Sequence, residues 1–310
     1  MACTPSSFAQ PADKTGRLVT GFPVGAGSDP IIRLVAEKMR GRYPFMFIVE
    51  NRTWAGGRIA ADAVRNAPAD GSTALFTPAS PLTIFPSLYR KLSYDPFKDF
   101  LPVGTVFSTQ MGVVRGPGCP ANTLAEYLAW ARSDPKNLVY GSGGAGTMPH
   151  FLGAMLKRET QVDLQHVPYK GGTPLWQDLL GGQVPVAFSP IAKDSAERHK
   201  AGKVKVLATA STSRMKNLPD VPTFAELGYP KLTMQEWFGL LLPARTPAQC
   251  VNDRHTALDE ALGEADVMSM LDINQTEHYR NTPQQFAALL RADTERWAGI
   301  VKSTSFTAED

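Results

Sequence analysis

The chain has 310 residues, of which 43% are hydrophobic and 20% charged, with a formal net charge of +3. This length exceeds the usual size of a single hydrophobic core, so we expect two domains. The small net charge and the lack of long runs of like charge argue against a nucleic acid or an anionic membrane surface as partner. The three cysteines, Cys3, Cys119 and Cys250, are widely separated, which favours neither a disulfide framework nor a zinc site.

The N-terminal segment leaves three alternatives open: Ser7-Phe8-Ala9-Gln10 as the remainder of a cleavage region, Met1-Ala2-Cys3 as a clipped lipoprotein site, or a segment without a targeting role. Residues 1–15 lack the basic and apolar parts of a signal peptide, and we expect them to form a disordered tail. Elsewhere, no apolar run approaches the roughly 18–20 residues that a membrane helix needs.

Short apolar segments alternate with amphipathic segments, which is typical of an α/β protein. The expected strands cover residues 18–22, 47–50, 74–77, 138–140, 164–167, 184–188, 204–209 and 238–242. The expected helices cover residues 30–39, 59–65, 123–132, 149–158, 174–180, 249–262 and 283–302. We expect a proline-containing loop between Pro78 and Pro102.

One pattern occurs twice: a strand, a glycine-rich turn and a helix, first near residue 25 and again near residue 145. In the first copy Asp29 is the expected N-cap and Pro30 the first helical residue. A helix N-terminus presents unpaired N–H groups and therefore binds anions without a charged side chain. One such turn in each domain would suit a ligand with two carboxylates. The simpler alternative is that the glycines only permit tight turns.

The second turn also matches a dinucleotide-binding pattern, through Gly141, Gly143 and Gly146. In that fold an acidic residue follows the next strand. Here Asp163 precedes the expected strand and Tyr169 follows it. A dinucleotide-dependent oxidoreductase therefore remains as an alternative function rather than the leading one.

The sequence predicts no catalytic residues, no metal site and no cofactor. Ser142 lacks the glycine two residues earlier that a nucleophile elbow requires. The five histidines form no metal-binding pair at i, i+4. His150 lies in the first turn of the second helix, where it either contacts a ligand or has a structural role.

Several motifs, in order along residues 17–302, resemble those of the receptors of tripartite tricarboxylate transporters, the Bug-type receptors. They include Phe22-Pro23-Val24-Gly25-Ala26 with Asp29 and Arg33, then Val49-Glu50-Asn51-Arg52, Val167-Pro168-Tyr169-Lys170-Gly171-Gly172, Leu218-Pro219-Asp220-Val221-Pro222-Thr223, and Trp237 with Gly239. The second glycine turn contributes Tyr140, Ser142, Gly144, Gly146, Thr147 and His150. One departure is Gly21, which stands where the family usually has proline.

The resemblance implies a bilobed type II periplasmic-binding-protein fold, with two α/β lobes around a ligand cleft. Lobe 1 would comprise residues 16–108 and 238–310, and lobe 2 residues 109–237, with crossings near 104–112 and 230–240. The implied ligand-binding residues are Phe22, Gly25, Ala26, Gly27, Ser28, Asp29, Ser80, Ser142, Gly144, Ala145, Gly146, Thr147, His150 and Tyr169.

The resemblance further implies a monomeric periplasmic receptor that passes a small carboxylate to membrane permease subunits. Amino acids, dicarboxylates, tricarboxylates and aromatic acids all remain open as ligands, and a sensor with the same fold is a second alternative. If backbone amides hold the ligand, an acid whose carboxyl pKa is near 4 should bind almost equally at pH 6 and pH 8. His150 is the residue expected to disturb this.

Overall fold

The computed structural model describes residues 14–25, 27–53, 55–304 and 306. Most of the expected N-terminal tail, and the predicted contact Ala26, therefore lie outside the described residues. Lys14 and Thr15, assigned to that tail, begin the first strand. None of the described helices is both long and apolar enough to cross a membrane.

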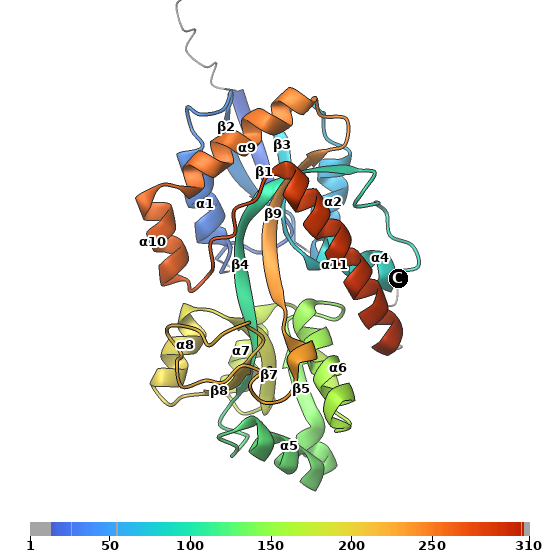
Figure 1. Ribbon diagram of the computed structural model, residues 1–310, viewed down its shortest axis with the longest axis vertical. Helices are drawn as coiled ribbons and strands as arrows, with labels where there is room; N and C mark the ends of the chain where they lie inside the picture. Colours follow the sequence, from blue (N-terminus) through green and yellow to red (C-terminus); the bar gives the residue numbers. More distant parts are fainter. Residues whose placement is uncertain (1–13, 26, 54, 305, 307–310) are drawn as a thin grey trace, which may run out of the picture.

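The chain alternates between strands and helices (Figure 1). The strands are β1 (Lys14–Thr20), β2 (Phe45–Asn51), β3 (Thr73–Pro78), β4 (Phe100–Arg115), β5 (Val139–Ser142), β6 (Gln165–Pro168), β7 (Val186–Ile191), β8 (Lys205–Thr209) and β9 (Gln235–Pro243). The α-helices are α1 (Asp29–Lys38), α2 (Arg58–Arg65), α3 (Ser80–Thr83), α4 (Phe85–Leu88), α5 (Leu124–Ser133), α6 (Met148–Thr160), α7 (Gly172–Leu180), α8 (Lys193–Lys200), α9 (Ala248–Leu262), α10 (Ala265–Ile273) and α11 (Pro283–Thr304). Three short 3₁₀ helices are η1 (Ala55–Gly57), η2 (Pro135–Leu138) and η3 (Pro230–Leu232).

Two lobes share one sheet, whose order is β2-β1-β3-β9-β4-β7-β5-β6, with β8 also paired to β4. Lobe 1 contains β1–β3, α1–α4 and α9–α11, and lobe 2 contains α5–α8 and β5–β8 (Figure 1). The strands β4 and β9 run antiparallel through both lobes. The expected bilobed α/β fold, in which the chain passes twice between lobes, is confirmed.

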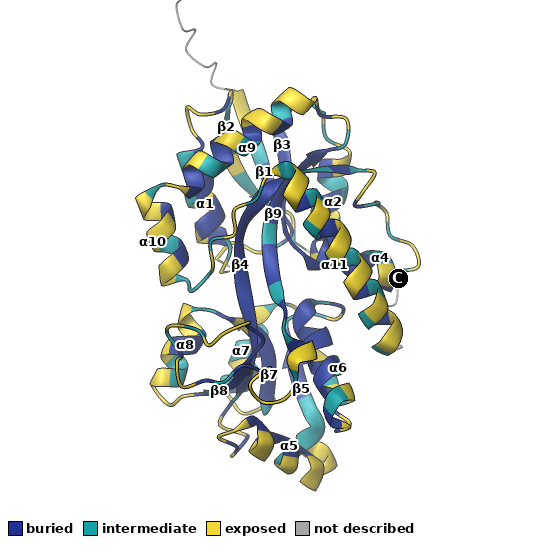
Figure 2. Ribbon diagram, in the orientation of Figure 1, coloured by how far each residue is buried: buried dark blue, intermediate teal, exposed yellow. Residues whose placement is uncertain are grey.

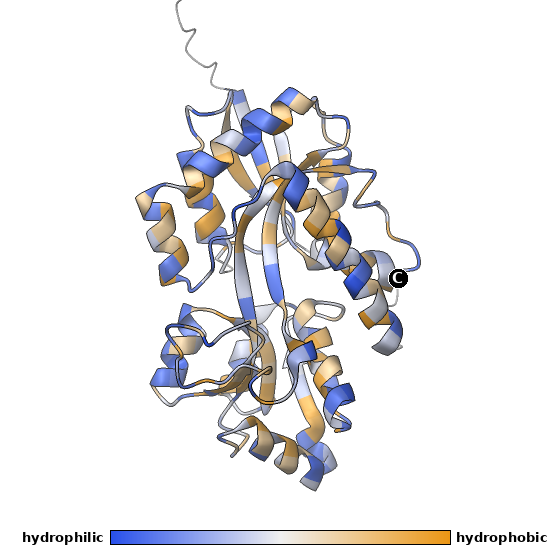
Figure 3. Cartoon of the chain, in the orientation of Figure 1, coloured by the Kyte–Doolittle hydropathy of each residue, from blue (hydrophilic) through white to orange (hydrophobic). Residues whose placement is uncertain are grey.

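The two shared strands are buried through most of their length (Figure 2). Their pairing to each other ends with Thr109 opposite Glu236 and Gln110 opposite Gln235, and beyond this point β4 pairs with β7 and β8. Figure 3 shows that both strands change from hydrophobic to hydrophilic where they pass between the lobes. The crossing point is therefore a polar segment enclosed by the protein.

Helix α11 joins the lobes a third time. It packs along α3 and α4 of lobe 1 and also contacts α6 of lobe 2. There the Trp297 ring lies 5.8 Å from that of Phe151, and Arg158 donates a hydrogen bond to Ser303 (2.6 Å). One hydrophobic core accordingly extends from α4 across to α6.

Three expectations from the sequence were incomplete. We expected no strand over residues 100–115, where the longest strand, β4, lies. Helices α8 and α10 were also not foreseen. The expected loop between Pro78 and Pro102 contains α3 and α4, because proline is compatible with the first turn of a helix and occupies that position in both.

Gly21 lies just after β1, where its backbone packs against that of Gly57. A Cβ atom at Gly21 would lie 2.3 Å from the Cα of Gly57. Because the atoms that such a Cβ would meet all belong to the backbone of Gly57, no flexible side chain could move aside to make room. Only glycine at position 21 therefore permits this approach, which brings η1 against the first glycine turn.

We predict that Gly21→Ala lowers the free energy of unfolding by about 1–3 kcal/mol, because the added methyl overpacks this contact. Urea denaturation measures the change. Gly299→Ala on α11 is the matched control: a Cβ there meets no atom within 4 Å, so it should stabilise the helix by up to about 1 kcal/mol. Unchanged stability in Gly21→Ala would contradict the close approach.

Candidate functional site

One carboxylate holds the first glycine turn, which joins β1 to α1. Asp29 accepts hydrogen bonds from the Gly25 N–H (3.1 Å), Arg33 Nε (2.9 Å) and Asn51 Nδ2 (3.1 Å). Burial acts to raise the pKa of Asp29, but the bonds from Arg33, Gly25 and Asn51 lower it overall. Asp29 is the first residue of α1 and Ser28 is the N-cap, so the predicted capping role of Asp29 is wrong.

The outer side of this turn is open. Val24 is 71% exposed, and a Cβ added at Gly25 or Gly27 would meet no atom within 4 Å. Phe22 is half-buried, and its carbonyl accepts a hydrogen bond from Asn51 (2.9 Å). The turn therefore presents uncovered backbone beside an aromatic side chain, as an anion-binding turn requires.

Hydroxyl groups shape the second glycine turn, which joins β5 to α6. Ser142 and Thr147 both donate to the Gly144 carbonyl, at 3.0 and 2.8 Å. Ser142 Oγ also lies 2.7 Å from His166 Nε2, and the residue is fully buried. Ala145 is exposed at the tip of the turn. The Ser142 hydroxyl is thus occupied by Gly144 of the loop and by His166 of β6.

His150 supports the same turn from beneath. Its Nδ1 accepts the Gly146 N–H (3.1 Å), and its ring stacks on His166 with the centroids 4.0 Å apart. The edge-on ring of Phe306 lies 4.4 Å away. Burial lowers the pKa of His150 to about 4, so the ring is neutral between pH 6 and pH 8. These contacts favour the structural role and remove His150 as a source of positive charge.

Helix α3 of lobe 1 lies between the two turns. The Ser80 hydroxyl accepts the Met148 N–H at the start of α6 (3.3 Å) and donates to Glu236 of β9 (2.8 Å). The next residue, Pro81, is close to Gly57, which packs against Gly21. A Cβ added at Gly57 would lie 3.5 Å from the Pro81 side chain. Gly57, which packs against Gly21 before the first turn, and Met148, which follows the second turn, therefore both lie against α3.

The body of the second turn also contacts lobe 1. Gly146 has a positive φ of 75°, and a Cβ there would lie 2.3 Å from the Leu88 side chain of α4. The ring of Phe85 would lie 2.9 Å from a Cβ at Gly56. Glycine at positions 56 and 146 lets η1 and the second turn approach α4 closely.

Tyr169, the remaining predicted contact, belongs to the wall beside the second turn. Its hydroxyl donates to Asp178 (2.9 Å), and its backbone N–H donates to the Ser142 carbonyl (2.9 Å). Burial, with the Asp178 hydrogen bond and charge, raises the pKa of Tyr169 to about 12. Its ring packs against Gly141, which has no side chain to obstruct it.

Sequence reasoning missed Glu236. This buried carboxyl sits at the polar crossing point, and burial raises its pKa to about 7. A signal was present, because a single glutamate stands in an otherwise largely apolar strand. A one-dimensional pattern does not show, however, that Ser80 of another element reaches it.

The arrangement does not suit a dinucleotide. Asp163 lies before β6, not at its carboxyl end, and pairs with Lys157 of α6. No group of three or more His, Cys, Asp or Glu suitable for a metal ion occurs within the described part of the chain.

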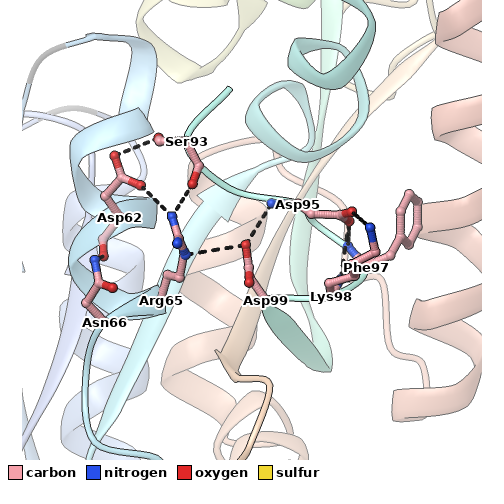
Figure 4. A network of polar contacts seen from close by, with 8 residues as sticks. All are labelled: Asp62, Arg65, Asn66, Ser93, Asp95, Phe97, Lys98 and Asp99. Atoms are coloured by element: carbon pink, nitrogen blue, oxygen red, sulfur yellow. Dashed lines mark hydrogen bonds and ion pairs between the residues drawn. The ribbon is translucent and has the colours of Figure 1, made fainter. Parts of the chain in front are cut away.

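An open hollow of about 600 Å³ lies on lobe 1 beside residues 86–99. Figure 4 shows polar side chains there bound to one another: Arg65 pairs with Asp99 (3.5 Å) and Asp95 with Lys98 (3.0 Å). These pairs fix the segment that precedes β4. Because these groups are already engaged, the hollow is a weaker candidate than the two turns.

We predict that acid destabilises the second turn through His150. An unfolded histidine takes up a proton near pH 6.5, whereas burial delays this to about pH 4 in the folded chain. Stability should therefore fall as the pH drops from 6.5 to 4, by as much as about 3 kcal/mol. Thermal unfolding of the natural chain and His150→Asn at several pH values measures this. Identical pH dependence in both proteins would contradict it.

The chain is similar to known proteins over most of its length. Residues 31–306 match the family described as the tripartite tricarboxylate transporter family receptor. Protein BugT of Bordetella pertussis is 29% identical over 93% of this chain and 88% of its own. A protein from Pseudomonas sp. strain P51, encoded between tcbD and tcbE, is 30% identical over 91% of this chain and 84% of its own.

Solved structures show the same fold. The periplasmic binding protein BugD is 28% identical, with a TM-score of 0.86 over 96% of this chain and all of its own. MatC from Rhodopseudomonas palustris, solved with malate, is 30% identical, with a TM-score of 0.85 over 93% and 99% of the two chains. An R. palustris protein solved with adipate is 29% identical, with a TM-score of 0.87 over 95% and 98%. With the family match covering most of its length, the chain belongs to the receptors of the tripartite tricarboxylate transporters.

Proposed function

We propose that this chain is a periplasmic receptor that binds a small organic carboxylate between its lobes and delivers it to membrane permease subunits. The observation that carries the proposal is that two strand–glycine turn–helix units, one from each lobe, are both linked to α3, the first through Gly57 and the second through Met148. Both turns offer backbone N–H groups at a helix N-terminus, which attract a carboxylate without a basic side chain. The malate and adipate bound to the two R. palustris relatives support this ligand class.

We assign ligand contact to the outward parts of the two turns. These parts are Phe22, Gly25, Gly27 and Ser28 in the first turn, and Gly144, Ala145 and Thr147 in the second. Ser80, the predicted contact between them, is buried, and its hydroxyl is engaged by Glu236 and Met148. Asp29, Ser142, Gly146, His150 and Tyr169 hold the loops through the hydrogen bonds described above. Ala26 keeps its predicted role, although it lies outside the described residues.

Binding is completed by movement of the lobes about β4 and β9. We place lobe 1 at residues 14–108, which adds Lys14 and Thr15 of β1 to the predicted span, and at 238–310, and lobe 2 at 109–237. A ligand favours the closed arrangement only through contacts that the open arrangement lacks. A carboxylate held by both turns at once meets this condition.

We predict that a carboxylate stabilises the chain and a nicotinamide nucleotide does not. At a concentration of about 100 Kd, a ligand adds about 2.7 kcal/mol to the free energy of unfolding. Thermal shift with malate, adipate, citrate and glutamate, followed by calorimetry of the best ligand, tests this. Tight NADH binding with no response to any organic acid would overturn the proposal.

We predict that Gly27→Val weakens binding but leaves the fold intact. The valine side chain meets open space within the chain, but it occupies the side of the turn from which a ligand would approach. Calorimetry should show at least a tenfold loss of affinity, about 1.4 kcal/mol. Gly299→Val, at another open position, is the control and should bind normally. Equal affinity in both variants would mean that the ligand lies elsewhere.

A further inference from the structure

Positive charge is in excess around the open hollow on lobe 1. The side chains that line it, adjoin it in the chain, or bind its rings and loop include six cations and three carboxylates. The cations are Arg58, Arg65, Arg90, Lys91, Lys98 and Arg291, and the carboxylates are Asp62, Asp95 and Asp99. This excess equals the formal net charge of the whole chain, +3, so the rest of the chain is neutral on balance.

The carboxylates at the hollow are engaged within the protein, whereas two of the cations are not. The three acids bind Ser93 (2.8 Å), Lys98 (3.0 Å) and Arg65 (3.5 Å), side chains that Figure 4 draws. Arg90 and Lys91 are exposed, and neither takes part in an ion pair within the described part of the chain. A partner could therefore bind these two cations without breaking an internal ion pair.

Two aromatic rings give the hollow an apolar part. Phe97 is 39% exposed, and the guanidinium of Arg291 lies 5.1 Å from the centre of its ring. Arg58 lies over the half-buried Tyr89 in the same way, at 4.0 Å. Arginine and aromatic side chains are enriched where proteins bind one another. With a volume of about 600 Å³, the hollow has room for side chains of a partner.

The arrangement of the cations distinguishes between anionic partners. Arg58 belongs to α2, Arg90 to the segment after α4 and Arg291 to α11, so positive groups from three elements border the hollow. A single small anion needs donors that converge on one point, and a flat membrane surface does not enter a concave hollow. An extended protein segment that carries several carboxylates and an apolar side chain fits both the charge and the rings.

The hollow is also close to the candidate ligand site. The Tyr89 ring packs edge-on against Phe85, with the ring centroids 5.0 Å apart. A Cβ added at Gly146 of the second turn would lie 3.8 Å from Phe85 and 2.3 Å from Leu88. A partner in the hollow would therefore lie beside α4, the helix of lobe 1 that the second turn contacts.

We propose that this hollow is a docking surface for an acidic segment of a partner protein. Arg90 and Lys91 bind carboxylates of that segment, and Phe97 packs against one of its apolar side chains. The contact involves no residue of the two glycine turns, so it does not rest on the carboxylate-binding role proposed above.

Fluorescence anisotropy of the full chain with two short labelled peptides tests the docking surface. One peptide alternates glutamate with leucine, and the other has serine in place of each leucine. At low ionic strength we expect the natural chain to bind the leucine peptide with a Kd below about 100 μM. The serine peptide should bind at least about threefold more weakly, because it lacks an apolar side chain for Phe97. Salt at 0.5 M should weaken binding of either peptide by about tenfold, because it screens exposed charges.

Arg90→Glu combined with Lys91→Glu should weaken binding of the leucine peptide by at least about tenfold, because both cations become like charges. Lys200→Glu combined with Lys203→Glu is the matched control. It makes the same change in charge at two exposed lysines of lobe 2 that form no ion pair within the described chain. It should bind within about twofold of the natural chain. Equal weakening in both double variants would reduce the effect to net charge and overturn the proposal.

Phe97→Ser should remove the preference for the leucine peptide while both peptides still bind. A preference that persists in this variant would contradict the role of the hollow.

Sedimentation with phosphatidylglycerol vesicles separates a protein partner from a membrane. We expect the natural chain to stay in solution. If it binds the vesicles through Arg90 and Lys91 but binds neither peptide, the surface contacts lipid and the proposal fails. Failure to bind either the peptides or the vesicles overturns it as well.

Discussion

The antiparallel pairing of β4 with β9 is the interaction on which the rest of the structure depends. These strands belong to both lobes, so every rotation of one lobe against the other must bend them. Their apolar stretches are fixed within the lobes, where they contribute buried residues such as Phe107 and Leu240 to the core. Only the short polar stretch around Thr109 and Glu236 lies between, which makes it the natural place for bending.

In the two glycine turns, side chains hold the loop in place and leave part of the backbone free of internal partners. Asp29 ties the first turn, and Ser142 with His150 ties the second, all through hydrogen bonds that point into the protein. The backbone that remains faces outward. A site built in this way is rigid before a ligand arrives, so little conformational freedom is lost on binding. In the binding role that we propose, such a site would recognise a carboxylate by charge and shape and leave the rest of the ligand to the other walls.

The lobes are coupled by more than the two strands. Helix α11 reaches α6 through Trp297 and Phe151, and Ser80 joins α3 to α6. These contacts lie to one side of the shared strands, next to the second turn. In the proposed lobe movement these contacts would break or slide, and their free energies would contribute to the balance between open and closed arrangements.

The sequence by itself determined the α/β class, most strands and helices, and the positions of both glycine turns, because these depend on local periodicity and on glycine. The order of motifs pointed to the bilobed receptor fold. Only the tertiary structure decided which groups meet. Glu236 and Ser80 are 156 residues apart in the chain, and a single-residue pattern carries no information on such a contact. The role of His150 was equally open in the sequence, since only burial beside His166 and Phe306 keeps its ring neutral.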